Sequence, residues 1–166
     1  MEQIYKSLRG LITNDMTAEI AKRLNAKEDV MSQAISATFA GFLVLTQMNG
    51  DTSQLRNIFE EAGSLGVLGK LEAVCTEPLT PETVSIGDNF LQHVLGDRAV
   101  GFTTWISLST GLSKVTINTL VAILAPVFVG YVGDKLLSNR WSMRKLLGLI
   151  SSQKGTYKKF IPEPVS

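Results

Sequence analysis

Two long stretches without a charged residue constrain this chain more than any other feature. Residues 30–48 and residues 115–133 each run for 19 positions without Asp, Glu, Lys or Arg. As helices, both would be long enough to cross a bilayer. Each also carries polar side chains at intervals, and hydroxyls in such positions can bond back to the carbonyls of their own helix. We therefore predict two long helices buried in a protein core, with membrane insertion as the alternative. Among these polar residues are Ser32, Gln33, Ser36, Thr38, Thr116, Asn118 and Thr119.

Residues that favour helix N-termini divide the rest of the chain into shorter predicted helices. The pair Thr80-Pro81 is typical of a helix start, because the threonine side chain can accept from a backbone N–H and proline fits the first turn. Asp97 and Ser142 are predicted to cap two further helices in the same way. No segment has the alternation of a half-buried strand. We predict an all-α, multihelical fold of about eight to nine helices, with the two long apolar helices at its centre.

Residues that favour helix C-termini predict where these helices end. Asn25 and Gly111 stand where a left-handed residue would end a helix. Gly63 is predicted to end the helix that begins near residue 53 in the same manner. A separate short helix is then expected over residues 65–73.

A weak internal repeat relates the two halves of the chain. At an offset of 86 residues, Phe42 pairs with Phe128 and Ile35 pairs with Val121. In each half a short helix ends in a tight turn and is followed by a long apolar helix. The repeat predicts that the two long helices are related by a pseudo-twofold axis and pack together at the centre.

The length of 166 residues suits one domain with a sizeable core. We assign residues 1–153 to a single helical domain. Residues 154–166 are basic and contain Pro162 and Pro164, so they are predicted to form a tail or the start of a linker.

Charge is balanced overall but unevenly distributed. The net charge of +1 excludes a globally basic nucleic-acid binder. Residues 51–97 hold eight acids and two bases, whereas residues 134–166 hold seven bases and two acids. Such segregation could steer a protein partner or a membrane surface. We expect weak membrane-surface contact through Lys154, Lys158 and Lys159.

The residues that build common active sites are scarce. Cys75 and His93 are the single cysteine and histidine, which excludes a disulfide framework, a zinc cage and a Cys/His active site within this chain. The segment from Gly63 to Lys70 resembles a phosphate loop only superficially, because Leu71 stands where Ser or Thr is required. We therefore predict that the protein is not an enzyme, with no catalytic, cofactor-binding or metal-binding residues.

Residues 20–34 imitate a DNA-binding helix-turn-helix, with a small residue before the turn and apolar residues after it. Glu28 and Asp29 open the helix that would read the bases, and phosphates repel them. The helix then becomes apolar. A structural helix corner is the favoured interpretation, and DNA binding is a third alternative.

Four short motifs follow one another in the second half of the chain. They are Gly87-x-x-Phe90-Leu91-x-x-Val94-Leu95-Gly96, Ser109-Thr110-Gly111-Leu112-Ser113, Leu120-x-x-x-Leu124-Ala125-Pro126-x-x-x-Gly130 and Leu146-Leu147-Gly148-Leu149-Ile150. In order and spacing they resemble the YidB-like family of bacterial domains of unknown function, and the resemblance covers roughly residues 1–153. Typical members carry more glycine between the halves and often have proline where Ala40 stands.

The resemblance implies a multihelical fold without an established enzymatic activity. Similar domains in some bacteria precede a membrane span and an OmpA-like domain, and Lys158 and Lys159 would then approach such a span. Glu2 stands where a signal peptide carries bases, so we expect no secretory signal. We expect a non-enzymatic interaction or scaffold domain with an unidentified protein partner, in the cytoplasm or at the inner face of the cytoplasmic membrane. A membrane-active, pore-forming protein is the alternative.

Overall fold

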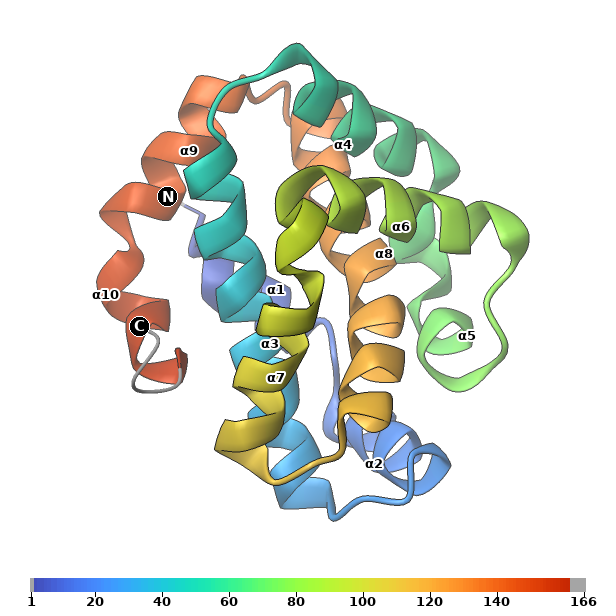
Figure 1. Ribbon diagram of the computed structural model, residues 1–166. Coiled ribbons are helices and arrows are strands. Elements are labelled where there is room, and N and C mark those ends of the chain that lie inside the picture. Colours follow the sequence, from blue (N-terminus) through green and yellow to red (C-terminus); the bar gives the residue numbers. More distant parts are fainter. Residues whose placement is uncertain (1, 162–166) are drawn as a thin grey trace.

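The computed structural model describes residues 2–161, which form a bundle of helices (Figure 1). This range contains nine α-helices and a tenth that is only four residues long. No strand occurs among these residues, so the predicted all-α class is confirmed. The α-helices are α1 (Ile4–Gly10), α2 (Asn14–Arg23), α3 (Glu28–Asn49), α4 (Ser53–Leu65), α5 (Leu71–Thr76), α6 (Pro81–Leu95), α7 (Ala99–Thr110), α8 (Lys114–Ser138), α9 (Met143–Ser152) and α10 (Lys154–Tyr157). Three 3-10 turns are η1 (Val67–Lys70), η2 (Gly96–Arg98) and η3 (Lys158–Phe160).

Local sequence explains where most of these helices begin and end. Asn25 (φ 56°) and Gly111 (φ 79°) are left-handed and close α2 and α7, as predicted. The predicted starts at Thr80-Pro81 and Ser142 are also confirmed. In five helices a threonine or serine side chain accepts a hydrogen bond from a backbone N–H of the first turn. These caps are Thr13, Thr52, Thr80, Ser113 and Ser142.

The predicted end of α4 at Gly63 is wrong. The helix continues to Leu65, and Gly66 takes the left-handed conformation instead (φ 71°). Gly63 faces Gly133 of α8, where a β-carbon built on Gly63 would lie 2.6 Å from the Gly133 carbonyl carbon. This glycine therefore allows two helices to approach closely and does not make a turn.

Two other predicted boundaries also differ from the structure. The helix expected over residues 65–73 is divided into η1 and α5. Asp97 does not cap α7, because it lies inside η2 and the helix begins after Arg98 without a side-chain cap. Each of these 3-10 turns begins at or just after a glycine with positive φ, Gly66 (φ 71°) or Gly96 (φ 51°), where the preceding α-helix cannot continue.

The two long helices are α3 and α8, and both are embedded in the fold. Every position from residue 123 to residue 133 of α8 is buried. The predicted back-bonding of hydroxyls is present in α3, where Thr38 Oγ1 donates to the Ala34 carbonyl (2.7 Å) and Thr46 Oγ1 donates to the Phe42 carbonyl (2.8 Å). By length and hydropathy both helices could also span a membrane, yet 67% of the apolar window of α3 and 72% of that of α8 lie inside this fold.

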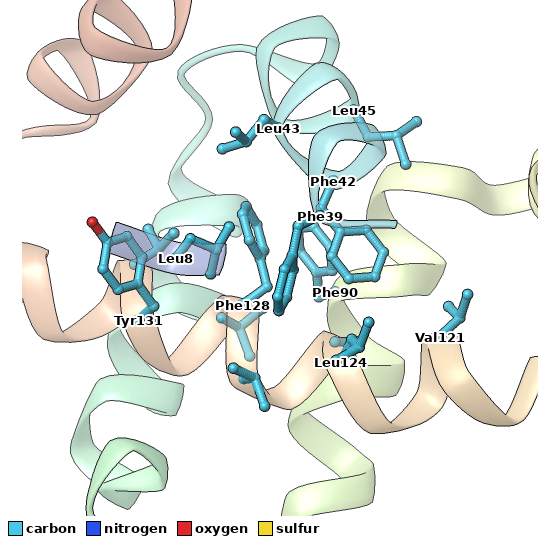
Figure 2. Packing of buried hydrophobic residues seen from close by; sticks show 14 of the residues in the cluster. Leu8, Phe39, Phe42, Leu43, Leu45, Phe90, Val121, Leu124, Phe128 and Tyr131 are labelled. Atoms are coloured by element: carbon cyan, nitrogen blue, oxygen red, sulfur yellow. The ribbon is translucent and has the colours of Figure 1, made fainter. Parts of the chain in front are cut away.

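A cluster of phenylalanine rings joins α3, α6 and α8 at the centre (Figure 2). The ring centroid of Phe42 lies 5.5 Å from that of Phe90 and 5.4 Å from that of Phe128. Phe90 and Phe128 are 5.2 Å apart, and all three side chains are fully buried. The two long helices therefore meet at the centre, although α4 and α6 are the main neighbours of α8. The 86-residue repeat that would relate them by an axis stays a prediction.

The C-terminal segment differs from the predicted tail as far as residue 161. Tyr157 is 2% exposed, and its hydroxyl donates to the Ile150 carbonyl (3.2 Å). The Phe160 ring stacks on Tyr5 of α1 at 5.0 Å between centroids. Figure 1 shows α10 following α9 along the side of α3. Residues 154–161 thus pack on the helical domain, and Pro162 and Pro164 lie outside the described residues.

Side-chain hydrogen bonds tie the two ends of the chain together. The Gln153 side chain accepts from the Ile4 amide (2.8 Å) and donates to the Glu2 carbonyl (2.7 Å). The Glu2 carboxylate accepts from the Tyr131 hydroxyl and lies 3.5 Å from Lys135 Nζ. The start of the chain therefore holds both α8 and the segment that leads into α10.

Candidate functional site

The structure separates the residues that sequence analysis considered for chemistry. Cys75 is buried in α5, and this burial raises the pKa of its thiol to about 11, so it stays protonated at neutral pH. His93 lies half-buried on α6. Within residues 2–161, no group of three His, Cys, Asp or Glu side chains is placed to hold a metal ion. These residues do not converge on one site.

The helix corner between α2 and α3 presents few groups that could bind DNA. Met31, Ala34 and Ile35 are the apolar residues that follow the turn, and all three are fully buried in the core. Glu28 and Asp29 are the exposed residues at the start of α3, and their charge repels phosphate. The geometry of the corner gives the DNA-binding alternative no support.

The strongest candidate site is a groove between α3, α7 and the C-terminal segment. It has a volume of about 490 Å³ and opens to solvent along one side. In Figure 1, α3 and α7 lie beside each other at the centre, with α10 on the far side of α3. We call this hollow the apolar groove. It is lined by Gly41, Val44, Leu45, Met48, Leu95, Arg98, Gly101, Phe102, Trp105, Lys154, Lys158 and Ile161.

Two glycines shape the apolar groove in different ways. Gly41 makes room for Phe102, since a β-carbon on Gly41 would lie 2.6 Å from Phe102 Cε1. The Phe102 ring stacks on Phe42 at 5.9 Å and meets Trp105 at 5.7 Å, which extends the phenylalanine cluster to the floor of the groove. Gly101 has no heavy atom within 4 Å of a built β-carbon, so that position faces open space.

The rim of the apolar groove is basic on two opposite sides. Arg98 lies at the start of α7, and its guanidinium donates to the Val94 carbonyl at the end of α6 (2.7 Å). Lys154 and Lys158 come from α10 and η3 on the other side. None of the described residues that line the groove is acidic. The groove therefore combines an apolar floor with a positively charged rim.

A second hollow of about 390 Å³ continues along the same three elements. Gln33 and Ala37 of α3 form its floor, Ser109 of α7 forms one wall, and Ile161 lines both hollows. Lys159 lines this second hollow, with its Nζ atom 5.3 Å from the centre of the Phe160 ring. The three lysines predicted to contact a membrane are thus divided between the two hollows.

The sequence points to these lysines but not to the apolar groove. The lining comes from three segments that lie far apart in the sequence, and no local pattern connects them. The available signal was the run from Tyr157 to Ile161, in which two bases stand between aromatic and aliphatic residues. Such a run is typical of a packed segment and not of a solvated tail.

The fold defines this protein as an all-α domain built around two long apolar helices. The family described as "Bacterial protein of unknown function (DUF937)" matches residues 3–135. The chain belongs to this family, which is also known as YidB-like, so the resemblance noted from the sequence is confirmed. No curated protein and no solved structure matches the chain. The matched segment includes the α3 and α7 walls of the apolar groove, whereas α10 and η3 follow it.

Proposed function

We propose that this protein is a non-enzymatic interaction domain that docks a partner protein in the apolar groove. The observation that carries the proposal is an open, apolar hollow with cations on two sides. Surfaces of this kind in proteins usually mark interaction sites. Neither Cys75 nor His93 lines the groove, so the proposal assigns binding and no reaction to it.

The proposed place of action is the cytoplasm or the inner face of the cytoplasmic membrane. Bases near residues 154–159 would favour weak contact with anionic lipid headgroups. A membrane-active protein is the second candidate, and the observation that favours it is the length and hydropathy of α3 and α8. Insertion would have to remove both helices from the phenylalanine cluster that now covers them, which makes this candidate the weaker one.

In-cell photo-crosslinking tests the proposed docking site. A photoreactive amino acid replaces Met48, which lines the groove and is 62% exposed, and in a matched control it replaces Val84 of α6, which is 40% exposed. We expect a discrete adduct from position 48 that is absent from position 84. Gly101→Trp should abolish the adduct, because the indole would fill the groove. Equal labelling at both positions, or an adduct unchanged by Gly101→Trp, would contradict the proposal.

A further inference from the structure

We infer that the partner segment is an amphipathic α-helix with acidic residues along both flanks of its apolar face. The inference rests on the proposed function and specifies the chemistry of the partner. Three features of the groove carry it: the composition of its floor, its open shape and the position of its cations.

The floor supplies a continuous apolar surface. Val44 and Leu45 of α3 and Phe102 of α7 form it, and Gly101 leaves a gap in the α7 wall that a side chain from outside can enter. Met48 stands at one end and is 62% exposed. Methionine adapts its shape to different apolar partners, which suits the end of a groove that receives a helix.

The open shape distinguishes a helix from a free lipid chain. A bound acyl chain would leave methylene groups in water along the open side, and only the methylene groups that are buried contribute to binding. Ligand sites for small apolar molecules usually enclose most of the ligand. An amphipathic helix instead buries its apolar stripe and keeps its polar face in solvent, so an open groove is sufficient for it.

The length of the groove also suits a helix. The apolar groove and the second hollow follow α3 from Met48 to Gln33 and share Ile161. At 1.5 Å per residue, this part of α3 extends for about 22 Å, which equals about four turns of a docked helix. Apolar side chains at helical spacing would enter the apolar groove as successive anchors, and the turns beside the second hollow would lie against its more polar lining of Gln33, Ser109 and Thr110.

The cations on the rim determine that the partner segment carries negative charge. Arg98 stands on the α7 side, and Lys154 and Lys158 stand on the opposite side, so an occupant meets positive charge along both edges. Glu or Asp residues on both flanks of the apolar stripe would pair with them. Such exposed pairs add little stability each, but they steer association and reject basic helices.

Fluorescence anisotropy with designed peptides tests this inference on the full chain. The acidic probe is a helix of about 15 residues, or four turns, with leucines along one stripe and glutamates on both flanks. A second probe replaces every glutamate with lysine, and a third keeps the glutamates but replaces the leucines with serine. We expect the acidic probe to bind at least about tenfold more tightly than either control, with an affinity that falls as salt increases.

Matched variants locate the binding. Gly101→Trp should abolish binding of the acidic probe, whereas Gly148→Trp should leave it unchanged, because Gly148 lies on α9 with open space around it and outside the groove. The pair Arg98→Glu and Lys158→Glu together should weaken binding at least about tenfold. Circular dichroism melts confirm that each variant remains folded.

Each other outcome overturns the inference. Equal affinity for the lysine probe, or binding that survives Gly101→Trp, rules out an acidic helix in the groove. Binding of phosphatidylglycerol vesicles that Gly101→Trp abolishes, without peptide binding, would assign the groove to a membrane. Self-association in sedimentation that the same variant abolishes would assign it to a second copy. If the in-cell adduct at position 48 persists while the acidic probe fails, the proposed function stands and this partner class is wrong.

Discussion

Gly63 of α4 and Gly133 of α8 lie so close together that neither position has room for a β-carbon. A β-carbon on Gly133 would overlap the Phe59 carbonyl oxygen and would lie 2.5 Å from the Gly63 nitrogen. The two helices therefore pack backbone against backbone at this crossing. Because α4 and α6 are the main neighbours of α8, this contact positions the central helix.

Gly133→Ala should destabilise the protein by about 2–4 kcal/mol, since the added methyl group meets backbone atoms that cannot rotate away. The loss should appear even though alanine is favoured over glycine in a helix by about 1 kcal/mol. Urea unfolding followed by circular dichroism measures it.

Gly148→Ala is the control for this prediction. Gly148 is also helical, but a β-carbon there has no heavy atom within 4 Å. Alanine should stabilise the protein at this position by about 0.5–1 kcal/mol. If both variants shifted the unfolding midpoint in the same direction, the close crossing of α4 and α8 would be wrong.

The phenylalanine cluster leads to a second prediction. Phe42→Ala and Phe128→Ala should each cost about 3–5 kcal/mol, because both side chains are fully buried. Their rings lie 5.4 Å apart, so the double variant should cost less than the sum of the single losses. Leu108→Ala, at a side chain that is 82% exposed, should change stability by less than about 0.5 kcal/mol. Near-additive losses in the double variant would mean that α3 and α8 do not share this core.

Local sequence was sufficient to predict most helix ends. A threonine followed by proline at residues 80–81 and an asparagine at position 25 act on their own backbone, so no tertiary contact is needed to read them. Gly63 shows where this reading fails. A glycine that ends a helix and a glycine that receives a neighbouring helix look alike in one sequence, and only the position of Gly133 distinguishes them.

The candidate site was harder to predict, because it depends on packing between distant segments. Lys154 and Lys158 suggested a solvated tail, since bases and nearby prolines are typical of linkers. The stacking of Phe160 on Tyr5 and the burial of Tyr157 hold these lysines beside α3 instead. The stacking of Phe160 on Tyr5 joins the two ends of the chain, so no spacing in the sequence indicates it.

The hydrogen-bonded Glu2 carboxylate at the start of the chain predicts a pH dependence of stability. The hydrogen bond from the Tyr131 hydroxyl, with a smaller contribution from Lys135, holds the pKa of the Glu2 carboxyl below its ordinary value of 4.5. A lowered pKa in the folded state stabilises the protein fully above the unfolded value, and this stabilisation is lost as the pH falls through the folded value. Glu2 therefore contributes at neutral pH and ceases to contribute in acid.

Glu2→Gln should accordingly destabilise the protein at pH 7 by about 1 kcal/mol, because the Glu2 carboxylate is partly exposed to solvent, and by much less near pH 3. Urea unfolding at the two pH values measures the difference. Glu61→Gln, at an exposed acid of α4, should change the stability at pH 7 by less than about 0.5 kcal/mol. A loss from Glu2→Gln that is equally large in acid would contradict the assigned ion pair.

Vesicle experiments separate the interaction domain from a pore-forming protein. Surface contact through Lys154, Lys158 and Lys159 should give weak association with anionic vesicles, worth about 1 kcal/mol per base near the surface, and salt should abolish it. A pore-forming protein would release dye and remain bound in high salt, because salt does not screen the interaction between buried apolar side chains and lipid.

Insertion would require α3 and α8 to leave the core that holds Phe42 and Phe128. We therefore expect no dye release between about pH 5 and pH 8, a range in which a single histidine provides little change of charge. Replacing the three lysines with glutamine should remove the salt-sensitive association, whereas leakage that survives high salt would contradict the interaction-domain proposal.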